Sequence, residues 1–438
     1  MKLSIAVVAR SICYRFPLPV LHSPTLDSFM RIAYLTGEYP RATDTFIQRE
    51  VAGLRALGVD VQTFSVRRPG IEQLVGEEQK AEFDRTTYLL PPNLPQLISS
   101  HLKLIKSGRY WRSLKLAWKT RQPGLRGSLY QLFYFLEAGI LARQIQIRQI
   151  QHLHNHLATS SGTVAMLAAE LGDFTFSFTL HGPYIFFEPY QWHLAEKIDR
   201  ALFVCCISHY CRSQGMVFAS IGAWNRMHII HCGIDPALFQ PVSHQGSGNR
   251  LLYVGRLAAV KGLPILLESL AKLVSSYPDL ELTVVGDGSD REPLETLTDS
   301  LNLRSQVKFV GYQSQTEVRH HLQQTDIFVM ASFAEGVPVV LMEAMAAGVP
   351  VVATQIAGVS ELVEHEINGY LVPAGDAETL ADRIGTLVED SELRSRFGLA
   401  GRAKVAAEFN IKTEAARLHQ LMSRALEGKS EAIRPAID

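Results

Sequence analysis

Two acidic residues lie in a stretch of sequence that otherwise has the composition of a protein interior. The stretch is FAEGVPVVLMEAMAAGVP, residues 333–350, and its only charged residues are Glu335 and Glu343. A buried carboxylate is costly unless hydrogen-bond donors satisfy it. Sugar hydroxyl groups are such donors, so we expect both carboxylates to bind a ligand rich in hydroxyl groups. The alternative is a pair satisfied by helix capping or by salt bridges.

Two basic residues upstream predict a site for an anion. In LLYVGRLAAVKG, residues 251–262, Arg256 and Lys261 follow a predicted strand closely enough to converge on one anion. Arginine supplies a planar two-point contact and lysine a compact charge; the alternative is two surface cations. A predicted helix runs from Pro338 to Gly348, and the free backbone N–H groups at its start also suit a phosphate. Together these features predict a ligand with phosphates and many hydroxyl groups.

These residues are positioned by an alternation of short apolar strands and helices. The alternation begins at Met30, stops at the linker FQPVSHQGSGNR, residues 239–250, and then restarts. Such strands predict parallel sheets covered on both faces, whose ligands bind beyond the carboxyl ends of the strands. We expect an α/β protein with two doubly wound Rossmann-like domains and a site in the cleft between them. The expected division is a disordered extension at 1–29, domains at 30–240 and 241–425, and a tail at 426–438.

The composition is that of an ordinary globular protein. Of 438 residues, 47% are hydrophobic and 20% are charged, and this length predicts two domains. Residues 30–240 carry 22 cations and 16 anions, whereas residues 241–438 have a net charge of about −8, so the two halves face different surroundings. Five cysteines without a C-x-x-C pair argue against a disulfide framework. No apolar run approaches the ~18 residues that span a bilayer, and we expect a cytoplasmic protein.

One segment, HLKLIKSGRYWRSLKLAWKTRQPGLRGSLYQLFYFL at residues 101–136, carries eight cations and no anion. Helical projection puts basic and aromatic residues on opposite sides, which is typical of a helix that binds an anionic membrane surface. The alternative is an amphipathic helix packed on a sheet. Nucleic acid is not expected as a partner, because the cations are local and no recognition motif accompanies them. The residues expected to contact the inner face of the plasma membrane are Arg109, Trp111, Arg112, Lys115, Trp118 and Lys119.

Several motifs of the sequence resemble those of a known family. The segment EGVPVVLMEAMAAGVPVVATQIAGVSELVEHEINGYLVPAGD is similar to the donor-site signature of the family 4 glycosyltransferases, which have the GT-B fold. GRLAAVKG resembles the diphosphate-binding motif of that family, and HCGIDPALFQP resembles its interdomain segment. In the first half, GEYPRATDTFIQREVAGLRALG, HLHNHLATSSGTVAMLAAELG and FTLHGPYIF are similar to members of colanic-acid type that build bacterial exopolysaccharides. The resemblance covers about residues 30–425.

The resemblance implies a retaining transferase that uses a nucleotide-diphosphate sugar as co-substrate, with a saccharide or lipid-linked saccharide as acceptor and no metal or other cofactor. It implies that Glu335 contacts the donor sugar, that Glu343 holds the ribose, and that Arg256 and Lys261 neutralise the diphosphate. His181 corresponds to the active-site histidine of the family. The remaining donor contacts implied by the resemblance are the diphosphate-binding Gly37, expected in a turn after the first strand, with Gly336, Val337 and Val339, and Tyr312 beside the base.

The motif HLHNH places His152, His154 and His156 at alternating positions of a strand. All three side chains would share one face, but no acidic or cysteine ligand stands beside them in sequence, so we expect no metal. We assign His156 to the acceptor pocket instead. One departure from the family pattern lies nearby: Tyr184 replaces an acidic residue in HGPYIF, which affects the hydrogen bonding expected on the acceptor side.

Other functions remain as alternatives. A GT-B-fold epimerase of a nucleotide sugar would release free nucleotide without an acceptor. A non-catalytic sugar-nucleotide-binding subunit is disfavoured because all the expected site residues are present. A nicotinamide dehydrogenase is weaker, since GDGSDR lacks the third glycine of the dinucleotide fingerprint. The two carboxylates are not read as a glycosidase pair, in which acid and nucleophile or base flank the bond that is broken.

Overall fold

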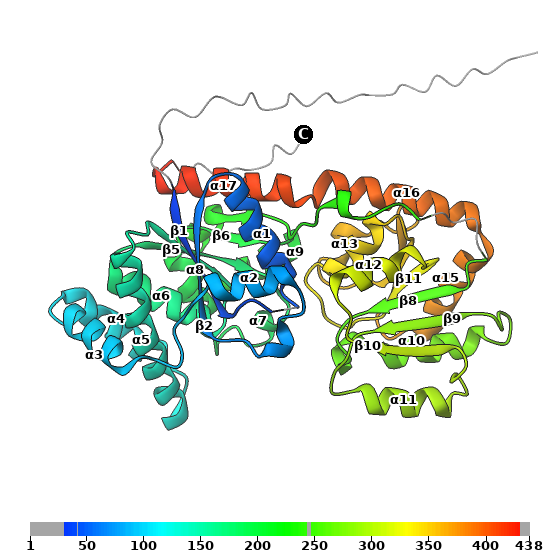
Figure 1. Cartoon of the computed structure of the whole chain (residues 1–438), viewed down its shortest axis with the longest axis horizontal. Coiled ribbons are helices and arrows are strands. Elements are labelled where there is room, and N and C mark those ends of the chain that lie inside the picture. The colour runs from blue at the N-terminus through cyan, green and yellow to red at the C-terminus, as the bar shows by residue number, and fades with distance from the viewer. Residues whose placement is uncertain (1–29, 42, 243–246, 430–438) are drawn as a thin grey trace, which may run out of the picture.

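The computed structural model describes residues 30–41, 43–242 and 247–429 of the chain. Within them, two parallel β-sheets stand side by side, each covered by helices (Figure 1). We call the sheet β1–β7 with its helices the first lobe, and the sheet β8–β13 with its helices the second lobe. The predicted extension at 1–29, and residues 430–438 of the predicted tail, lie outside the described residues.

The first sheet has the strand order β3-β2-β1-β4-β5-β6-β7, and all its strand pairs are parallel. The order reverses at β1, which pairs with β2 on one side and β4 on the other. Strands β4 and β6 are buried along their whole length, as expected of strands covered on both faces. The strands are β1 (Arg31–Glu38), β2 (Asp60–Arg67), β3 (Thr87–Tyr88), β4 (His152–His156), β5 (Thr175–Leu180), β6 (Val204–Cys206) and β7 (Met227–Ile229).

The helices of the first lobe cover both faces of this sheet and extend to one side of it, where α3, α4 and α5 lie together (Figure 1). They are α1 (Thr45–Ala56), α2 (Glu77–Arg85), α3 (Leu94–Leu104), α4 (Gly108–Lys119), α5 (Gly124–Ile147), α6 (Ser160–Gly172), α7 (Tyr184–Phe187), α8 (Leu194–Arg200) and α9 (His209–Phe218), with short 3₁₀ helices η1 (Ile71–Gln73) and η2 (Ile221–Arg226).

The basic segment at 101–136 runs through three helices. Ser107 caps α4 by accepting a hydrogen bond from the backbone N–H of Arg109. Pro123 precedes α5, and Gly124 adopts a positive φ of 85°, which glycine tolerates without steric cost. Ser107 therefore marks the boundary between α3 and α4, and the Pro-Gly pair marks the boundary between α4 and α5.

The second sheet has the order β10-β9-β8-β11-β12-β13, again all parallel, and reverses at β8. Its strands are β8 (Arg250–Val254), β9 (Glu281–Val285), β10 (Val307–Gly311), β11 (Ile327–Met330), β12 (Val351–Thr354) and β13 (Gly369–Val372). The helices after the first lobe are η3 (Pro236–Leu238), η4 (Ala259–Lys261), α10 (Leu263–Leu273), α11 (Arg291–Ser300), α12 (Gln315–Gln323), α13 (Val339–Ala346), α14 (Val359–Leu362), α15 (Ala377–Glu389), α16 (Ser391–Glu408) and α17 (Ile411–Leu426).

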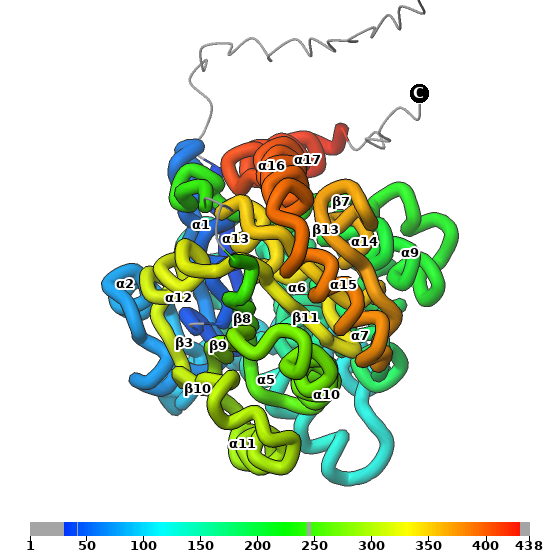
Figure 2. The backbone as a smooth tube through the Cα atoms, turned by 90° about the vertical axis from the view of Figure 1, so that its right-hand side faces the viewer, coloured from blue at the N-terminus to red at the C-terminus, as the bar shows by residue number. Residues whose placement is uncertain are grey.

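The last helix returns to the first lobe. Figures 1 and 2 show α16 and α17 along one edge of the molecule, and α17 reaches the first sheet. Leu418 and Met422 of α17 belong to the same buried cluster as Ile32 of β1 and Val51 of α1. A Cβ added to Gly53 of α1 would lie 2.7 Å from the Ala415 Cβ, so the two helices pack closely. The boundaries at 240 and 425 stay a prediction, but α17, assigned to the second domain, packs on the first lobe.

Two local predictions need correction. Pro338 lies at the N-cap of α13 with an extended ψ of 123°, one position before the first helical residue. Gly37 lies inside β1 and not in a turn after it, and a Cβ added there would meet nothing within 4 Å.

We expect Leu418→Ala to lower the free energy of unfolding by about 2–5 kcal/mol, because the side chain is completely buried between α17 and the first sheet. Urea denaturation followed by circular dichroism would measure the change. Leu399→Ala, on α16 with 72% of the residue exposed, is the matched control and should change stability by no more than about 0.5 kcal/mol. Equal changes in the two variants would contradict the docking of α17.

Candidate active site

The residues predicted to do chemistry follow strands at the points where the two sheets reverse their strand order. Gly37 is the last residue but one of β1 and His156 ends β4 in the first lobe, while Arg256 follows β8 and Glu335 follows β11 in the second. His181 follows β5, the strand beside β4. Ligands of doubly wound sheets bind at such reversal points. The topology therefore places both sets of residues at ligand-binding edges.

The two edges touch at Gly336 and His181. A Cβ added to Gly336 would lie 2.2 Å from the backbone oxygen of His181, so any side chain at position 336 would collide with the first lobe. A second contact across the lobes lies nearby, where the backbone N–H groups of His209 and Tyr210 donate to the Glu361 carboxylate at 2.7 and 2.8 Å. The carboxylate thus caps the N-terminus of α9, where it also meets the positive end of the helix dipole.

Glu343 is satisfied by a residue of the other lobe. The carboxylate is 2% exposed and accepts a hydrogen bond of 2.7 Å from Nη2 of Arg49, on α1. The same Nη2 donates to Oε1 of Gln315 at 2.9 Å, while Nη1 of Arg49 is buried without a hydrogen-bond partner among the described residues. This carboxylate is thus satisfied by a salt bridge, as in the alternative considered from the sequence. Its partner comes from the first lobe, across the boundary between the two lobes, which we call the seam. A ligand that replaces Arg49 would have to supply equivalent donors.

The carboxylate of Glu335 pairs with one of the predicted phosphate-binding cations. Nζ of Lys261 lies 2.6 Å from Oε1 of Glu335, and the hydroxyl of Ser332 donates to the same oxygen at 2.7 Å. Lys261 ends η4, and Gly262 after it has a φ of 64°; a Cβ there would lie 2.0 Å from the backbone oxygen of Ala331. Glycine is therefore required for the η4 turn to pack against the end of β11.

The other predicted cation contacts the first lobe. Nη2 of Arg256 donates to the hydroxyl of Tyr184 at 3.2 Å. Tyr184 is the residue that replaces an acid in the family pattern, and it begins the short helix α7 after His181. A neutral hydroxyl leaves the charge of Arg256 uncompensated, whereas a carboxylate would neutralise it. The departure from the family pattern therefore preserves a positive charge at the seam.

His181 stands at the end of a buried chain of hydrogen bonds. Its Nε2 lies 2.8 Å from Nδ1 of His156, whose Nε2 lies 3.0 Å from Oε1 of Glu50. The hydroxyl of Tyr34 donates to the same carboxylate oxygen at 2.7 Å. On its other side, Nδ1 of His181 lies 3.6 Å from the sulfur of Cys232, a weak donor. The chain thus links α1, β1, β4 and the loop after β5.

The carboxylate of Glu50 sets the proton positions along this chain. Burial opposes its ionisation, but the attraction and hydrogen bond of His156 together with the Tyr34 hydroxyl outweigh burial, and the pKa of Glu50 is lowered. This stabilisation is present above the ordinary glutamate pKa of about 4.3 and is lost only as the pH falls through the lowered value. Burial, with the neighbouring His156, lowers the pKa of His181 well below its usual range, so its ring is neutral at pH 7.

The tautomers follow from hydrogen-bond chemistry. An ionised carboxylate only accepts, so Nε2 of His156 donates to Glu50. When His156 carries a single proton, its Nδ1 accepts from Nε2 of His181, and Nδ1 of neutral His181 is left as an acceptor. Glu50 and His156 therefore fix the orientation and the proton position of His181.

The three histidine side chains of β4 lie on one face, as predicted. However, the ring nitrogens of two of these histidines already contact hydroxyl groups of β5. His152 contacts Thr175 and Ser177, and His154 contacts Ser177 and Thr179, at 2.7 to 2.9 Å. Glu50, His154 and His156 offer ligand atoms within 4.8 Å of one another. Each ring nitrogen of His154 and His156 already has a hydrogen-bond partner, so a metal would have to break these bonds.

The structure corrects the assignment of His156. This residue is completely buried and both of its ring nitrogens are bonded within the protein, so it does not line an open acceptor pocket. Tyr312 lies after β10 and is 48% exposed, and Val337 is 5% exposed just before α13. Val339 is the first residue of α13. These residues and Gly37 keep their predicted donor contacts as proposals.

Two family models match nearly the whole described chain. The model described as Glycosyltransferase Family 4 matches residues 44–238, and the model described as Glycosyl transferases group 1 matches residues 235–404. The chain belongs to glycosyltransferase family 4. This glycosyltransferase is thus an enzyme of the class that the sequence motifs predicted.

Known relatives of this glycosyltransferase include proteins of polysaccharide synthesis. It is similar to the amylovoran biosynthesis glycosyltransferase AmsK of Erwinia amylovora, with 28% identity over 435 residues that cover 90% of this chain and 100% of AmsK. It is also similar to the putative colanic acid biosynthesis glycosyltransferase WcaL of Escherichia coli, with 32% identity over 209 residues, 45% of this chain and 52% of WcaL.

Solved structures confirm the predicted GT-B fold. HepE of Anabaena, in complex with UDP, superposes with a TM-score of 0.69 at 20% identity, covering 90% of this chain and all of HepE. Sucrose-phosphate synthase of Thermosynechococcus elongatus gives a TM-score of 0.72 at 21% identity, covering 91% of this chain and all of the synthase. At these identities the likeness concerns the fold alone.

Arg49, Glu50 and Gln315 were not predicted as site residues from the sequence. Arg49 and Glu50 are adjacent on α1, yet one reaches the second lobe and the other turns into the first lobe. A signal was present in QREV at residues 48–51, where a charged pair interrupts the buried side of an amphipathic helix. Gln315 lies in the first turn of α12. That turn is polar, so no charged pair within a buried helix face marks this residue.

We expect Glu50→Gln to lower kcat roughly 10- to 100-fold with the donor KM nearly unchanged, as for other groups that orient a site residue. The amide can donate as well as accept, so it no longer fixes the proton on His156. Steady-state kinetics would measure kcat and the donor KM separately. Glu82→Gln is the matched control, because Glu82 likewise accepts from a tyrosine, Tyr39, and pairs with Arg55. Equal losses of kcat in both variants would reduce Glu50 to a structural role.

Proposed function

We propose that this glycosyltransferase moves a sugar, with retention of configuration, from a nucleotide-diphosphate sugar to a saccharide or lipid-linked saccharide in cell-surface polysaccharide synthesis. The observation that carries the proposal is the meeting of the two reversal edges at Gly336 and His181, with Glu335, Lys261 and Arg256 beside that contact. The relatives AmsK and WcaL, whose names refer to amylovoran and colanic acid, support the polysaccharide part. HepE, solved with UDP and with UDP-glucose, supports the donor class.

The donor would take over interactions that the protein now makes with itself. The diphosphate would attract Lys261 away from Glu335, freeing that carboxylate for hydroxyls of the donor sugar. The ribose would take the place of Arg49 on Glu343, and Tyr312 would pack on the base. Each exchange replaces one satisfied partner with another, so no carboxylate is left uncompensated in a buried site.

Transfer breaks the bond between the anomeric carbon and the diphosphate oxygen and forms a bond from that carbon to an acceptor oxygen. The bonding electrons leave with the diphosphate, where Arg256, Lys261 and backbone N–H groups of Gly336 and Val337 would stabilise the charge. The proton of the acceptor hydroxyl passes to the departing diphosphate oxygen in the same exchange. Nδ1 of neutral His181 would accept a hydrogen bond from a substrate hydroxyl, because its present partner is only the Cys232 sulfur.

We expect purified protein to release nucleotide from its donor only when an acceptor is added. Glu343→Ala should weaken nucleoside diphosphate binding about tenfold or more, since the ribose hydroxyls lose the charged acceptor of their hydrogen bonds, while His181→Ala should suppress turnover with a milder loss of binding. Calorimetry and a nucleotide-release assay would measure the two effects.

The matched controls are exposed residues of the same types, Glu292→Ala and His320→Ala, which should leave binding and turnover unchanged. Full activity in both site variants would remove the site assignment. Release of nucleotide with a rearranged sugar and without an acceptor would indicate an epimerase instead of a transferase.

We also propose that helices α3 to α5 contact the membrane, through apolar residues more than through the predicted cations. Three of those cations form ion pairs within the lobe: Arg109 with Asp173, Arg112 with Glu170, and Lys119 with Glu196. The exposed apolar residues include Leu94, Ile98 and Leu102 on α3, Trp111 and Trp118 on α4, and Leu125, Leu129, Leu132 and Phe133 on α5. Among the described residues, no helix is both long enough and apolar enough to cross a bilayer.

We expect Leu125→Ser combined with Leu129→Ser to lower binding to vesicles that contain anionic phospholipid roughly tenfold, because each side chain removes apolar surface from the contact. Co-sedimentation with the vesicles would measure it. Leu399→Ser in the second lobe is the control, because its exposure of 72% lies between those of Leu129 and Leu125, and it should bind like the unchanged protein. Unchanged sedimentation of the double variant would exclude this surface.

A further inference from the structure

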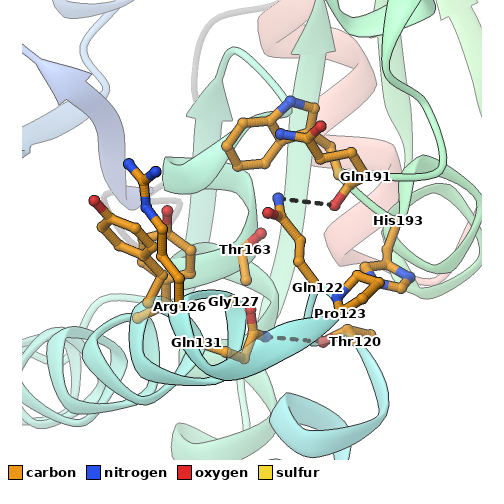
Figure 3. Close-up of a pocket in the computed structure, with 12 residues that line it drawn as sticks. Thr120, Gln122, Pro123, Arg126, Gly127, Gln131, Thr163, Gln191 and His193 are labelled. Carbon is orange, nitrogen blue, oxygen red and sulfur yellow. Dashed lines mark hydrogen bonds between the residues drawn. The ribbon is translucent and has the colours of Figure 1, made fainter.

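A cavity of about 420 Å³ lies in the first lobe, away from the contacts of the donor site (Figure 3). Its wall comes from the end of α4, the first turns of α5, the start of α6 and the segment between α7 and α8. Figure 3 shows side chains from these elements facing a common space. A sugar ring or a short saccharide fits a cavity of this size.

The cavity and the candidate active site share one segment of chain. Residues 181–193 begin with His181 at the seam, continue through Tyr184, which contacts Arg256, and end with Gln191, Trp192 and His193 in the cavity wall. Helix α6, which contributes Thr163, follows directly on β4, whose last residue His156 contacts His181. The cavity therefore lies beside the chain segment that carries His181 and Tyr184.

The wall combines aromatic rings with amide groups. Tyr130 and Tyr134 form a stacked pair with ring centroids 6.4 Å apart, and Trp192 contributes a third ring. Gln131 donates one amide hydrogen to the Thr120 hydroxyl at 2.9 Å, and its side-chain oxygen has no other bond among the described residues. Rings that pack on C–H groups and amides that bond hydroxyls suit a saccharide.

The charge in the wall is positive. None of the residues that line the cavity is acidic, and Arg126 is the only lining cation. Arg126 lies over the ring of Tyr130 at 5.5 Å and forms no ion pair with any part of the chain that the structure describes. Burial, and secondly the nearby Lys197, lower the pKa of His193, so its ring adds hydrogen bonds but no charge at pH 7. An unpaired guanidinium beside aromatic rings favours a carboxylate on the bound ring.

We propose that this cavity is an acceptor subsite that binds a sugar ring carrying a carboxylate, with the ring against Trp192 and the carboxylate at Arg126. The inference rests on the proposed glycosyl transfer and names a part of the acceptor. The donor residues face the seam, whereas this cavity would hold a sugar unit behind the one that reacts. Specificity for the acceptor would then reside in the α4–α5 turn and the α7–α8 segment.

The test is saturation-transfer NMR on the full chain with methyl β-glucuronide and methyl β-glucoside, which differ in the carboxylate. We expect the glucuronide to bind roughly threefold more tightly, the scale of one partly exposed ion pair. Arg126→Gln should abolish this preference, and Trp192→Ala should remove the signal of both sugars. Trp224→Ala, a tryptophan of η2 outside the cavity, is the control and should retain both signals.

Equal binding of the two sugars to the unchanged protein, no signal from either, or a glucuronide signal that survives Trp192→Ala would overturn the inference. A mixture of ADP, GDP and UDP in the same sample reports separately on the proposed function. If no nucleotide gives a signal with the unchanged protein, glycosyl transfer is contradicted. The sugar signals, in contrast, test whether the cavity is an acceptor subsite.

Discussion

The structure depends on the satisfaction of buried carboxylates at the edges of two sheets. Glu343, Glu335 and Glu50 lie in surroundings where an unpaired charge would be too costly, and each finds a different solution. Glu343 takes its partner from the other lobe, Glu335 from its own lobe, and Glu50 from a tyrosine and a histidine. Only the first two partners are cations that a phosphate-bearing ligand can attract. The third carboxylate, Glu50, instead holds His156, which in turn holds the ring of His181.

The contact of Gly336 with His181 explains how the three buried carboxylates can all find their partners near one another. Because no side chain intervenes, the backbone of the second lobe reaches the residue that the first lobe orients. The same closeness lets Arg49 cross to Glu343 and lets Glu361 cap α9. The predicted difference in charge between the halves thus has a local counterpart at the seam, where acids of the second lobe meet donors of the first.

Much of the fold and part of the site could be predicted from the sequence. Apolar strands alternating with helices predicted both parallel sheets, and the motifs placed Arg256 and Glu335 after strands and Glu343 in a helix, where the structure has them. The partners of these residues could not be predicted, because Arg49 and Glu50 are neighbours on one helix whose packing decides where each side chain goes. His156 shows the same limit: alternation gave the correct face of β4, but only the position of Glu50 reveals that this face is closed.

Helix α17 has a consequence for the design of hybrid enzymes. The chain passes between the lobes twice, once through the segment before β8 and again from α16 to α17, so the lobe that begins the chain is completed by its end. A chimera joined at the linker alone would combine the apolar side of one parent's terminal helix with the α1 surface of the other. An exchange of donor or acceptor halves must therefore transfer α17 together with the opening half, as a two-segment graft.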